Sequence, residues 1–407
     1  MATNHDHHLA RQALYIQRRD QAERRFETTF HHRESKPFDF QQFRFSQLNS
    51  TGMAPWVSFD RRARAVVERC YLQRYREDNP IPYFHWVSMA QPNAFASTDG
   101  EFDIVAFSKE MWLAVFGSVN ALFAHPKAFA SVGNVELESP PANPGTSMLG
   151  GKGSIESLRF PNCPVRLQVA SQVIIDLTDF LIEHELQHLL RGHAGYMNAQ
   201  YSLPASIHLP SNAIDTALNG LPISMFHQAV ETQADGPALT ICIKHALFDH
   251  YPSRDKLIQA GMPGEIYDEL KQTIRPDQKT RIYWFFVALH IFFGVLSRER
   301  GMVKLGARTH PPSWARGLMA STTLKATLIN NNELPDCRDD IGRLNGLAMG
   351  RTAEAARAAF VGDGIDYSPV LPPEEFSIPY YETIGNVLAK LQPEFERHQR
   401  DSSEYHV

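Results

Sequence analysis

The feature that most constrains the fold is an apolar run of 15 residues, Ile282–Leu296, which reads IYWFFVALHIFFGVL. As an α-helix with a rise of about 1.5 Å per residue it would span about 22 Å, whereas the hydrocarbon core of a bilayer is about 30 Å thick. The run also contains His290. We therefore predict a core helix that the rest of the chain must cover, with membrane insertion as the minority alternative.

The remaining sequence has the composition needed to cover such a helix. Of 407 residues, 43% are hydrophobic, enough for one large domain or two average ones with a sizeable core. The net charge is only −5, which argues against a nucleic-acid-binding protein that relies on a basic patch. Four scattered cysteines favour free thiols in a reducing compartment, and the polar N-terminus resembles no signal peptide. These features predict a cytoplasmic protein without a membrane span.

Hydrophobic periodicity predicts a mainly helical α+β fold with a small sheet. The sheet is expected within residues 82–107, where β-prone residues surround a turn at Thr98-Asp99-Gly100. Ser108 is a candidate N-cap for the helix that follows. Two segments, 138–154 and 200–222, are expected to be loops. The helices are predicted over residues 8–30, 58–77, 108–124, 171–194, 224–248, 280–298 and 380–399.

The sequence His-Glu-Leu-Gln-His at residues 184–188 carries the clearest chemical signal. Positions i and i+4 of an α-helix share one face, so His184 and His188 can bind one Zn²⁺ ion. Glu185 lies beside them and can act on a water molecule held by the metal. The five-residue pattern alone is weak, but the apolar helical stretch before it favours a buried site.

A catalytic zinc ion needs a third protein ligand. The metzincin pattern would place it as a histidine six residues after His188, but that position is Ala194, and Arg191 replaces the expected glycine. His193 is one residue away from the required spacing and would not share the helical face of the other two. We interpret it as a packing or hydrogen-bonding histidine beside Gly192.

Carboxylates on a later helix offer another third ligand. Glu231 and Asp235 stand four residues apart, so they share one helical face. One of them can bind zinc while the other accepts a hydrogen bond from a ligand imidazole and fixes its tautomer. Pro237 follows closely and should either kink this helix or mark the start of a new one.

Four motifs in the same order resemble those of gluzincin metallopeptidases of the CAAX-prenyl-protease and HtpX type. The layout is also similar to that of the phage-exclusion protease Lit, a soluble member of this broad group. The resemblance covers roughly residues 55–320, and the chain lacks the transmembrane helices of the membrane-bound members. The matching segments are Pro92-Asn93-Ala94-Phe95-Ala96, His184-Glu185-x-x-His188, Glu231-x-x-Ala234-Asp235 and Thr309-His310-Pro311-Pro312-Ser313-x-x-Arg316.

The resemblance implies a zincin-like core over residues 55–320, between an N-terminal helical extension (1–54) and a C-terminal one (321–407). It implies Glu231 as the third zinc ligand and His310 as a second donor to the oxyanion. It also implies that Asn93, Ala94, Phe95 and Ala96 form an edge strand that pairs with an extended substrate. Asp235 would orient a ligand, and Arg316 is interpreted as a structural ion-pair partner, with Asp235 as the candidate.

The sequence therefore predicts an endopeptidase that uses one Zn²⁺ ion and acts on a protein or peptide. Two alternatives stay open: a catalytically silent protein that zinc stabilises, and a zinc hydrolase of non-peptide amides. Glu185 speaks against the first, because a structural zinc ion needs no general base. An edge strand speaks against the second, because a small amide would not need it. The physiological substrate and the oligomeric state do not follow from the sequence.

Overall fold

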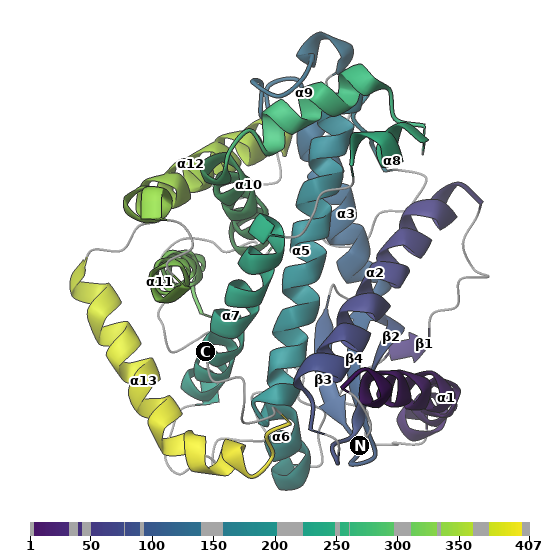
Figure 1. The fold of residues 1–407 in the computed structure, drawn as a ribbon. Helices are drawn as coiled ribbons and strands as arrows, with labels where there is room; N and C mark the ends of the chain where they lie inside the picture. Colours follow the sequence, from purple (N-terminus) through teal and green to yellow (C-terminus); the bar gives the residue numbers. More distant parts are fainter. Residues whose placement is uncertain are drawn as a thin grey trace.

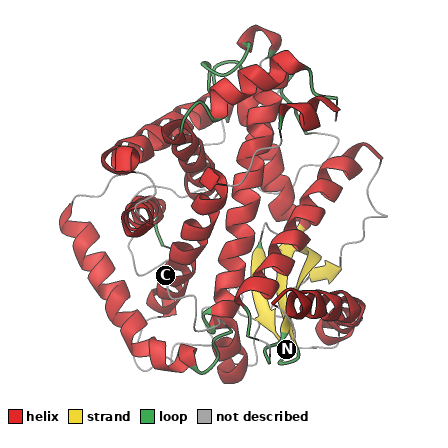
Figure 2. Cartoon of the chain, in the orientation of Figure 1, coloured by secondary structure: helices red, strands yellow, loops and turns green. Residues whose placement is uncertain are grey.

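In the computed structural model of the protein, the fold is described for most of the chain. The described residues are 4–31, 40–42, 50–76, 78–89, 93–139, 158–201, 223–248, 253–259, 261–296, 311–331, 335–360 and 374–400. They form a mainly helical structure with one small sheet, as Figure 2 shows. The predicted α+β class is confirmed at this level. The predicted loops at 138–154 and 200–222 lie almost wholly outside the described residues.

The sheet has four strands in the order β1-β2-β4-β3, so β3 lies at an edge. β2 runs parallel to β4, and β3 pairs antiparallel with β4. The predicted turn between β3 and β4 is confirmed: Gly100 adopts a φ of +90°, which favours glycine, and Asp99 accepts hydrogen bonds from the amides of Glu101 and Phe102. The strands are β1 (Phe40–Gln42), β2 (Ile81–Met89), β3 (Ala94–Thr98) and β4 (Phe102–Ser108).

The helices account for most of the remaining described residues. Ser108 caps α3 as predicted, since its side chain accepts a hydrogen bond from the amide of Met111. The longer helices are α1 (Asn4–His31), α2 (Ser50–Arg74), α3 (Lys109–Phe123), α5 (Pro164–Leu190), α7 (Ile223–Phe248), α10 (Gln278–His290), α11 (Ser313–Asn331), α12 (Ile341–Ala359) and α13 (Glu374–Glu396). The shorter ones include η2 (Val135–Leu137), α6 (His193–Tyr201), α8 (Arg254–Gln259), α9 (Gly264–Ile274), the π-helix η4 (Ile291–Leu296) and η6 (Pro335–Asp340).

The helix α5 runs through the middle of the molecule, with the sheet, α1 and α2 on one side and α7, α11 and α13 on the other (Figure 1). It begins seven residues before the predicted start, with Pro164 in its first turn, where proline costs no hydrogen bond. It ends before the predicted 194 because Gly192 has a φ of +83° and turns the chain into α6. Nearly all of its second half is buried.

Buried ion pairs fix the rotation of α5 about its own axis. Three acidic residues on α5 each meet an arginine from α2 or α10, and the acidic side chains are at most 7% exposed. A buried charge is costly without its partner, so these pairs disfavour other orientations of the helix. The pairs are Asp176–Arg281, Asp179–Arg62 and Glu183–Arg74.

The apolar run 282–296 forms most of α10 and the π-helix η4. Phe285, Val287 and Phe293 are at most 2% exposed, so the prediction of a core element is confirmed. In the described part of the chain, no helix combines the length and apolar character that crossing a membrane requires. The four cysteines are buried and no disulfide joins them, as expected.

Both extensions outside residues 55–320 pack on the rest of the protein. Arg11 of α1 donates hydrogen bonds to the carbonyls of Tyr71 and Tyr75 at the end of α2. Near the C-terminus, Arg400 pairs with the fully buried Asp103 of β4. The limits predicted at 54/55 and 320/321 fall inside α2 and α11, and the division into domains itself stays a prediction.

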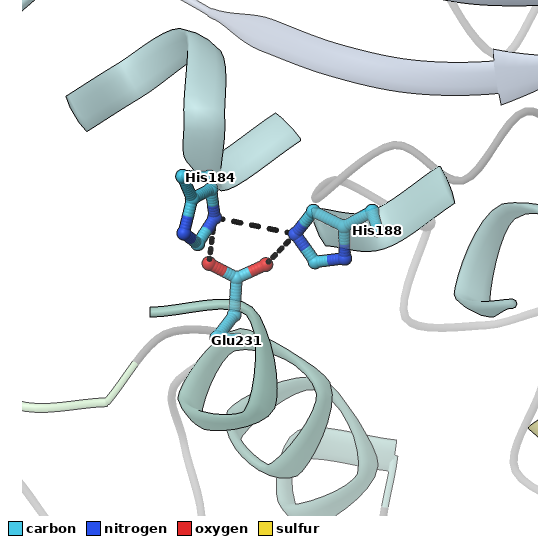
Figure 3. A group of neighbouring side chains, drawn as sticks. All are labelled: His184, His188 and Glu231. Carbon is cyan, nitrogen blue, oxygen red and sulfur yellow. Dashed lines mark hydrogen bonds and ion pairs between the residues drawn. The ribbon is translucent and has the colours of Figure 1, made fainter. Parts of the chain in front are cut away.

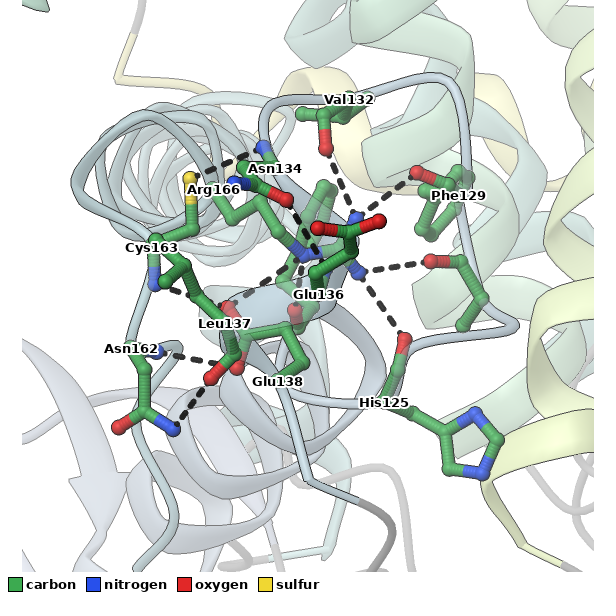
Figure 4. Close-up of polar contacts among 12 residues, drawn as sticks. His125, Phe129, Val132, Asn134, Glu136, Leu137, Glu138, Asn162, Cys163 and Arg166 are labelled. Atoms are coloured by element: carbon green, nitrogen blue, oxygen red, sulfur yellow. Dashed lines mark hydrogen bonds and ion pairs between the residues drawn. The ribbon is translucent and has the colours of Figure 1, made fainter.

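A buried arginine near the start of α5 organises the loop that follows α3. The guanidinium of Arg166 is fully buried and donates hydrogen bonds of 2.7–3.0 Å to five backbone carbonyls, as Figure 4 shows. Glu138 lies 3.6 Å from it and accepts hydrogen bonds from the amides of Asn162 and Cys163. Arg166 therefore joins α5 to the loop. The five carbonyls belong to Phe123, His125, Ala128, Phe129 and Val132.

Candidate metal centre

The two histidines of the His-Glu-x-x-His sequence lie one turn apart on α5 and face α7. Their side chains are 4% exposed, and their Nε2 atoms are 3.2 Å apart. The predicted sharing of one helical face is confirmed. Figure 3 shows both rings pointing at the same carboxylate, which comes from α7.

That carboxylate belongs to Glu231, which the resemblance implied as the third ligand. Its Oε2 lies 3.2 Å from Nε2 of His184, and its Oε1 lies 3.3 Å from Nε2 of His188. One carboxylate oxygen and the two ring nitrogens all lie within 4.8 Å of one another, and a tetrahedral metal ion with bonds of about 2.0 Å would place its ligand atoms about 3.3 Å apart. Among the described residues, only these three His, Cys, Asp or Glu side chains form a group that can hold a metal ion.

A second carboxylate on α7 fixes the orientation of His184. Oδ1 of Asp235 lies 2.8 Å from Nδ1 of His184, and Arg316 from α11 binds the same carboxylate with two hydrogen bonds of 2.6 and 2.7 Å. The ion pair expected between Arg316 and Asp235 is therefore present. A carboxylate in this position accepts a hydrogen bond from the Nδ1–H group of the imidazole. A neutral His184 therefore has its lone pair on Nε2. The guanidinium of Arg316 also lies over the ring of Phe293, 4.5 Å from its centroid.

Both acidic residues come from one helix, although Pro237 follows Asp235 by two residues. Pro237 lies inside α7, which runs from Ile223 to Phe248 as one helix. Of the two predicted outcomes, a kink or a new start, the new start is therefore excluded. The side chain of Thr240 donates a hydrogen bond to the carbonyl of Gly236, next to the proline. The uninterrupted helix keeps Glu231 and Asp235 on one face, opposite α5.

His193 does not belong to the ligand group, but it touches one of its members. Its Nδ1 lies 3.0 Å from Nδ1 of His188, and its Nε2 lies 2.7 Å from Oε1 of Gln233. The predicted role as a hydrogen-bonding histidine is confirmed. Gln233 was missed by the sequence analysis, because a glutamine two residues after Glu231 carries no motif. The signal that could have placed His193 near His188 is Gly192, whose positive φ ends α5 and starts a new helix at His193.

Glu185 is buried beside the ligands and is only 1% exposed. Its Oε2 makes no hydrogen bond within the described part of the chain. Burial raises the pKa of its carboxyl, while the His184 and His188 imidazoles oppose this. A buried carboxylate oxygen without a partner, next to two histidines, is suited to exchange a proton with a bound molecule.

The residues predicted to bind substrate lie on or beside the edge strand β3. Ala94, Phe95 and Ala96 pair with Phe107, Ala106 and Val105 of β4, and β3 contacts both α5 and α6. Asn93 comes just before β3, exchanges hydrogen bonds with Ser108, and keeps a buried side-chain amide nitrogen that has no partner among the described residues. The edge strand is present beside α5, and its binding of substrate stays a prediction.

The last motif is only partly described. Thr309 and His310 lie outside the described residues, so the role of His310 stays a prediction. Pro311 and Pro312 are buried ahead of α11, and Arg316 lies in its first turn, where it reaches Asp235. This motif therefore supplies Arg316, the ion-pair partner of Asp235 at the metal centre.

Metal binding should release a proton from His184. Burial alone would lower the pKa of His184, but Glu231 and Asp235 outweigh burial and raise it to about 10. His184 is therefore protonated at pH 7 in the metal-free protein, and a metal must displace that proton. We expect close to one proton released per ion and an affinity that rises up to tenfold per pH unit towards pH 10.

Calorimetric titration with Zn²⁺ in two buffers of different ionisation enthalpy measures this release. Asp235→Asn is the control, because it removes one of the charges that raise the pKa of His184 and should release fewer protons. A binding enthalpy that does not depend on the buffer would contradict the expectation.

Comparison of the chain with protein-family models, with curated proteins and with solved structures finds no match.

Proposed function

We propose that the protein is a zinc-dependent endopeptidase of the gluzincin type, with His184, His188 and Glu231 as metal ligands. The observation that carries the proposal is the position of Glu185. Its buried carboxylate has an oxygen with no partner among the described residues and lies next to His184 and His188 on the same helix, and a purely structural metal ion needs no such group. Two imidazoles and one carboxylate are a ligand set that zinc uses in catalytic sites, where it keeps a fourth position open for water.

A zinc ion bound in this centre would act as a Lewis acid, lowering the pKa of water towards about 7 and stabilising negative charge on a carbonyl oxygen. Glu185 accepts the proton of the attacking water, and its raised pKa suits it to hand that proton on to the leaving amine. Asp235 and Arg316 hold His184 in place during the reaction. His310 is the proposed second donor to the oxyanion.

The edge strand β3 favours a peptide over a small amide as the substrate. An extended peptide can add to the edge strand of a sheet through backbone hydrogen bonds, and Nδ2 of Asn93, which has no partner among the described residues, can donate one more. The five residues of β3 are buried, so the substrate must gain access to this edge when it binds. The edge strand supports the endopeptidase over a hydrolase of non-peptide amides.

The proposal is tested with the purified protein and unfolded protein substrates. We expect cleavage that a zinc chelator abolishes and that one equivalent of Zn²⁺ restores. Binding of zinc without cleavage of any unfolded protein would favour the catalytically silent alternative. Cleavage that survives complete removal of the metal would overturn the proposal.

Asn93→Ala should affect long peptides more than short ones. Loss of one substrate hydrogen bond costs about 1 kcal/mol, so kcat/KM for a peptide of about ten residues should fall roughly five- to tenfold. A dipeptide amide that does not reach β3 should be cleaved almost as before. Steady-state kinetics on the two substrates measures the difference, and equal losses on both would argue against strand addition at β3.

A further inference from the structure

Gly192 and the end of α13 place His193 beside His188, one of the proposed metal ligands. The positive φ of Gly192 separates α5 from α6, and a Cβ atom there would lie 2.2 Å from the carbonyl oxygen of Phe395. The ring of Phe395 packs against His193 with 4.7 Å between centroids. His193 is only 1% exposed, so its ring nitrogens depend on protein partners.

A chain of side-chain hydrogen bonds starts on α13 and fixes how the amides are oriented. The carboxylate of Glu396 can only accept, so Gln392 donates to it with Nε2 at 3.1 Å. Oε1 of Gln392 then faces Gln233, whose Nε2 donates to it at 2.9 Å. This leaves Oε1 of Gln233 as the acceptor that His193 meets at 2.7 Å.

The same hydrogen-bond directions determine which ring nitrogen of each histidine carries the proton. His193 must carry its proton on Nε2 to donate to Gln233, so a neutral His193 has a lone pair on Nδ1. That lone pair lies 3.0 Å from Nδ1 of His188, which must then donate its own Nδ1–H. Nε2 of His188 is left with its lone pair, and this atom is the one that faces Glu231 and His184.

We propose that His193 is a positioning residue that holds His188 in the Nδ1–H tautomer, so that Nε2 of His188 is free to bind the metal. The proposal rests on the metal centre proposed above. It adds a residue that binds no metal itself but orients one of the three ligands. His184 and His188 are thereby oriented differently: His184 by the charged pair of Asp235 and Arg316, His188 by a neutral imidazole that Gln233 fixes. Residues that orient metal-binding histidines commonly contribute 10- to 100-fold to metal affinity.

The affinity of the purified chain for Zn²⁺, measured by competition with a chelator, tests the proposal. We expect His193→Ala to weaken binding about 10- to 100-fold. His193→Asn should stay within about threefold of the wild type, because Oδ1 of asparagine can replace the acceptor Nδ1. Gln233→Leu, which alters the chain without touching His188, should weaken binding by a smaller factor. His125→Ala is the matched control, since it removes a buried histidine from the end of α3 and should leave the affinity unchanged.

A spectroscopic readout separates orientation from general loss of structure. In zinc-loaded, ¹⁵N-labelled protein, the Nδ1 atoms of His188 and His193 should show scalar coupling across their N–H···N hydrogen bond. The proposal is overturned if zinc binds but the coupling is absent and His193→Ala binds as tightly as the wild type. If the wild type binds no zinc, the metal centre itself is refuted along with this role. If zinc binds and peptidase activity is missing, only the proposed activity fails.

Discussion

Replacing Glu185 with glutamine is expected to lower kcat/KM for peptide cleavage roughly 10²- to 10⁴-fold without removing the metal. Glutamine has nearly the same shape, so the burial of this side chain beside His184 and His188 is preserved. It cannot accept a proton from water, however, and cannot return one to the leaving amine. The loss should therefore lie in kcat, while the zinc content stays at that of the wild type.

Parallel metal analysis and peptidase kinetics on the variant measure this effect. Glu231→Ala is the matched contrast, because it removes a proposed ligand and should abolish zinc binding and activity together. A Glu185→Gln variant that cleaves peptides at the rate of the wild type would refute the proposed general base. A variant that loses zinc instead would place Glu185 among the ligands.

Replacing Arg166 with methionine is expected to lower the free energy of unfolding by about 5 kcal/mol. The guanidinium is fully buried and satisfies five carbonyls, so its removal leaves several of them without a donor. It also leaves the buried carboxylate of Glu138 without its neighbouring cation. Because domains are stable by only about 5–15 kcal/mol, this single change removes a large part of the free energy of unfolding.

Urea unfolding monitored by circular dichroism measures the loss. Arg166→Lys keeps the charge but provides three donors instead of five, so it should cost less and still fold. Arg397→Met, at an exposed position just after the end of α13, is the control and should change stability by less than about 0.5 kcal/mol. If Arg166→Met were as harmless as the control, the hydrogen bonds of Arg166 would not stabilise the loop as described.

Helical spacing allowed each half of the metal centre to be predicted, and the family resemblance implied that Glu231 of the second half joins the two histidines of the first. Residues four apart share a face wherever they are helical, and this places His184 with His188 and Glu231 with Asp235. Apolar periodicity likewise predicted the buried α5 and the core position of the run 282–296. The turn at Gly100 followed from the conformational freedom of glycine.

Other features depend on contacts between distant segments, which no local pattern records. The approach of His193 to His188 depends on the turn at Gly192 and on the packing of Phe395 from α13. The partners of Arg166 are backbone carbonyls, which look alike in every sequence. At Pro237, packing of α7 against α5 and α11 outweighs the local tendency of proline to end a helix.

The metal content and metal coordination of the purified protein test the central claim most directly. Elemental analysis should find one zinc ion per chain, and X-ray absorption at the zinc edge should show nitrogen and oxygen ligands at about 2.0 Å, with scattering from two imidazoles. Glu231→Ala should abolish this signal. A chain that takes up no zinc, or one whose zinc coordination is unchanged when Glu231 is removed, would contradict the account.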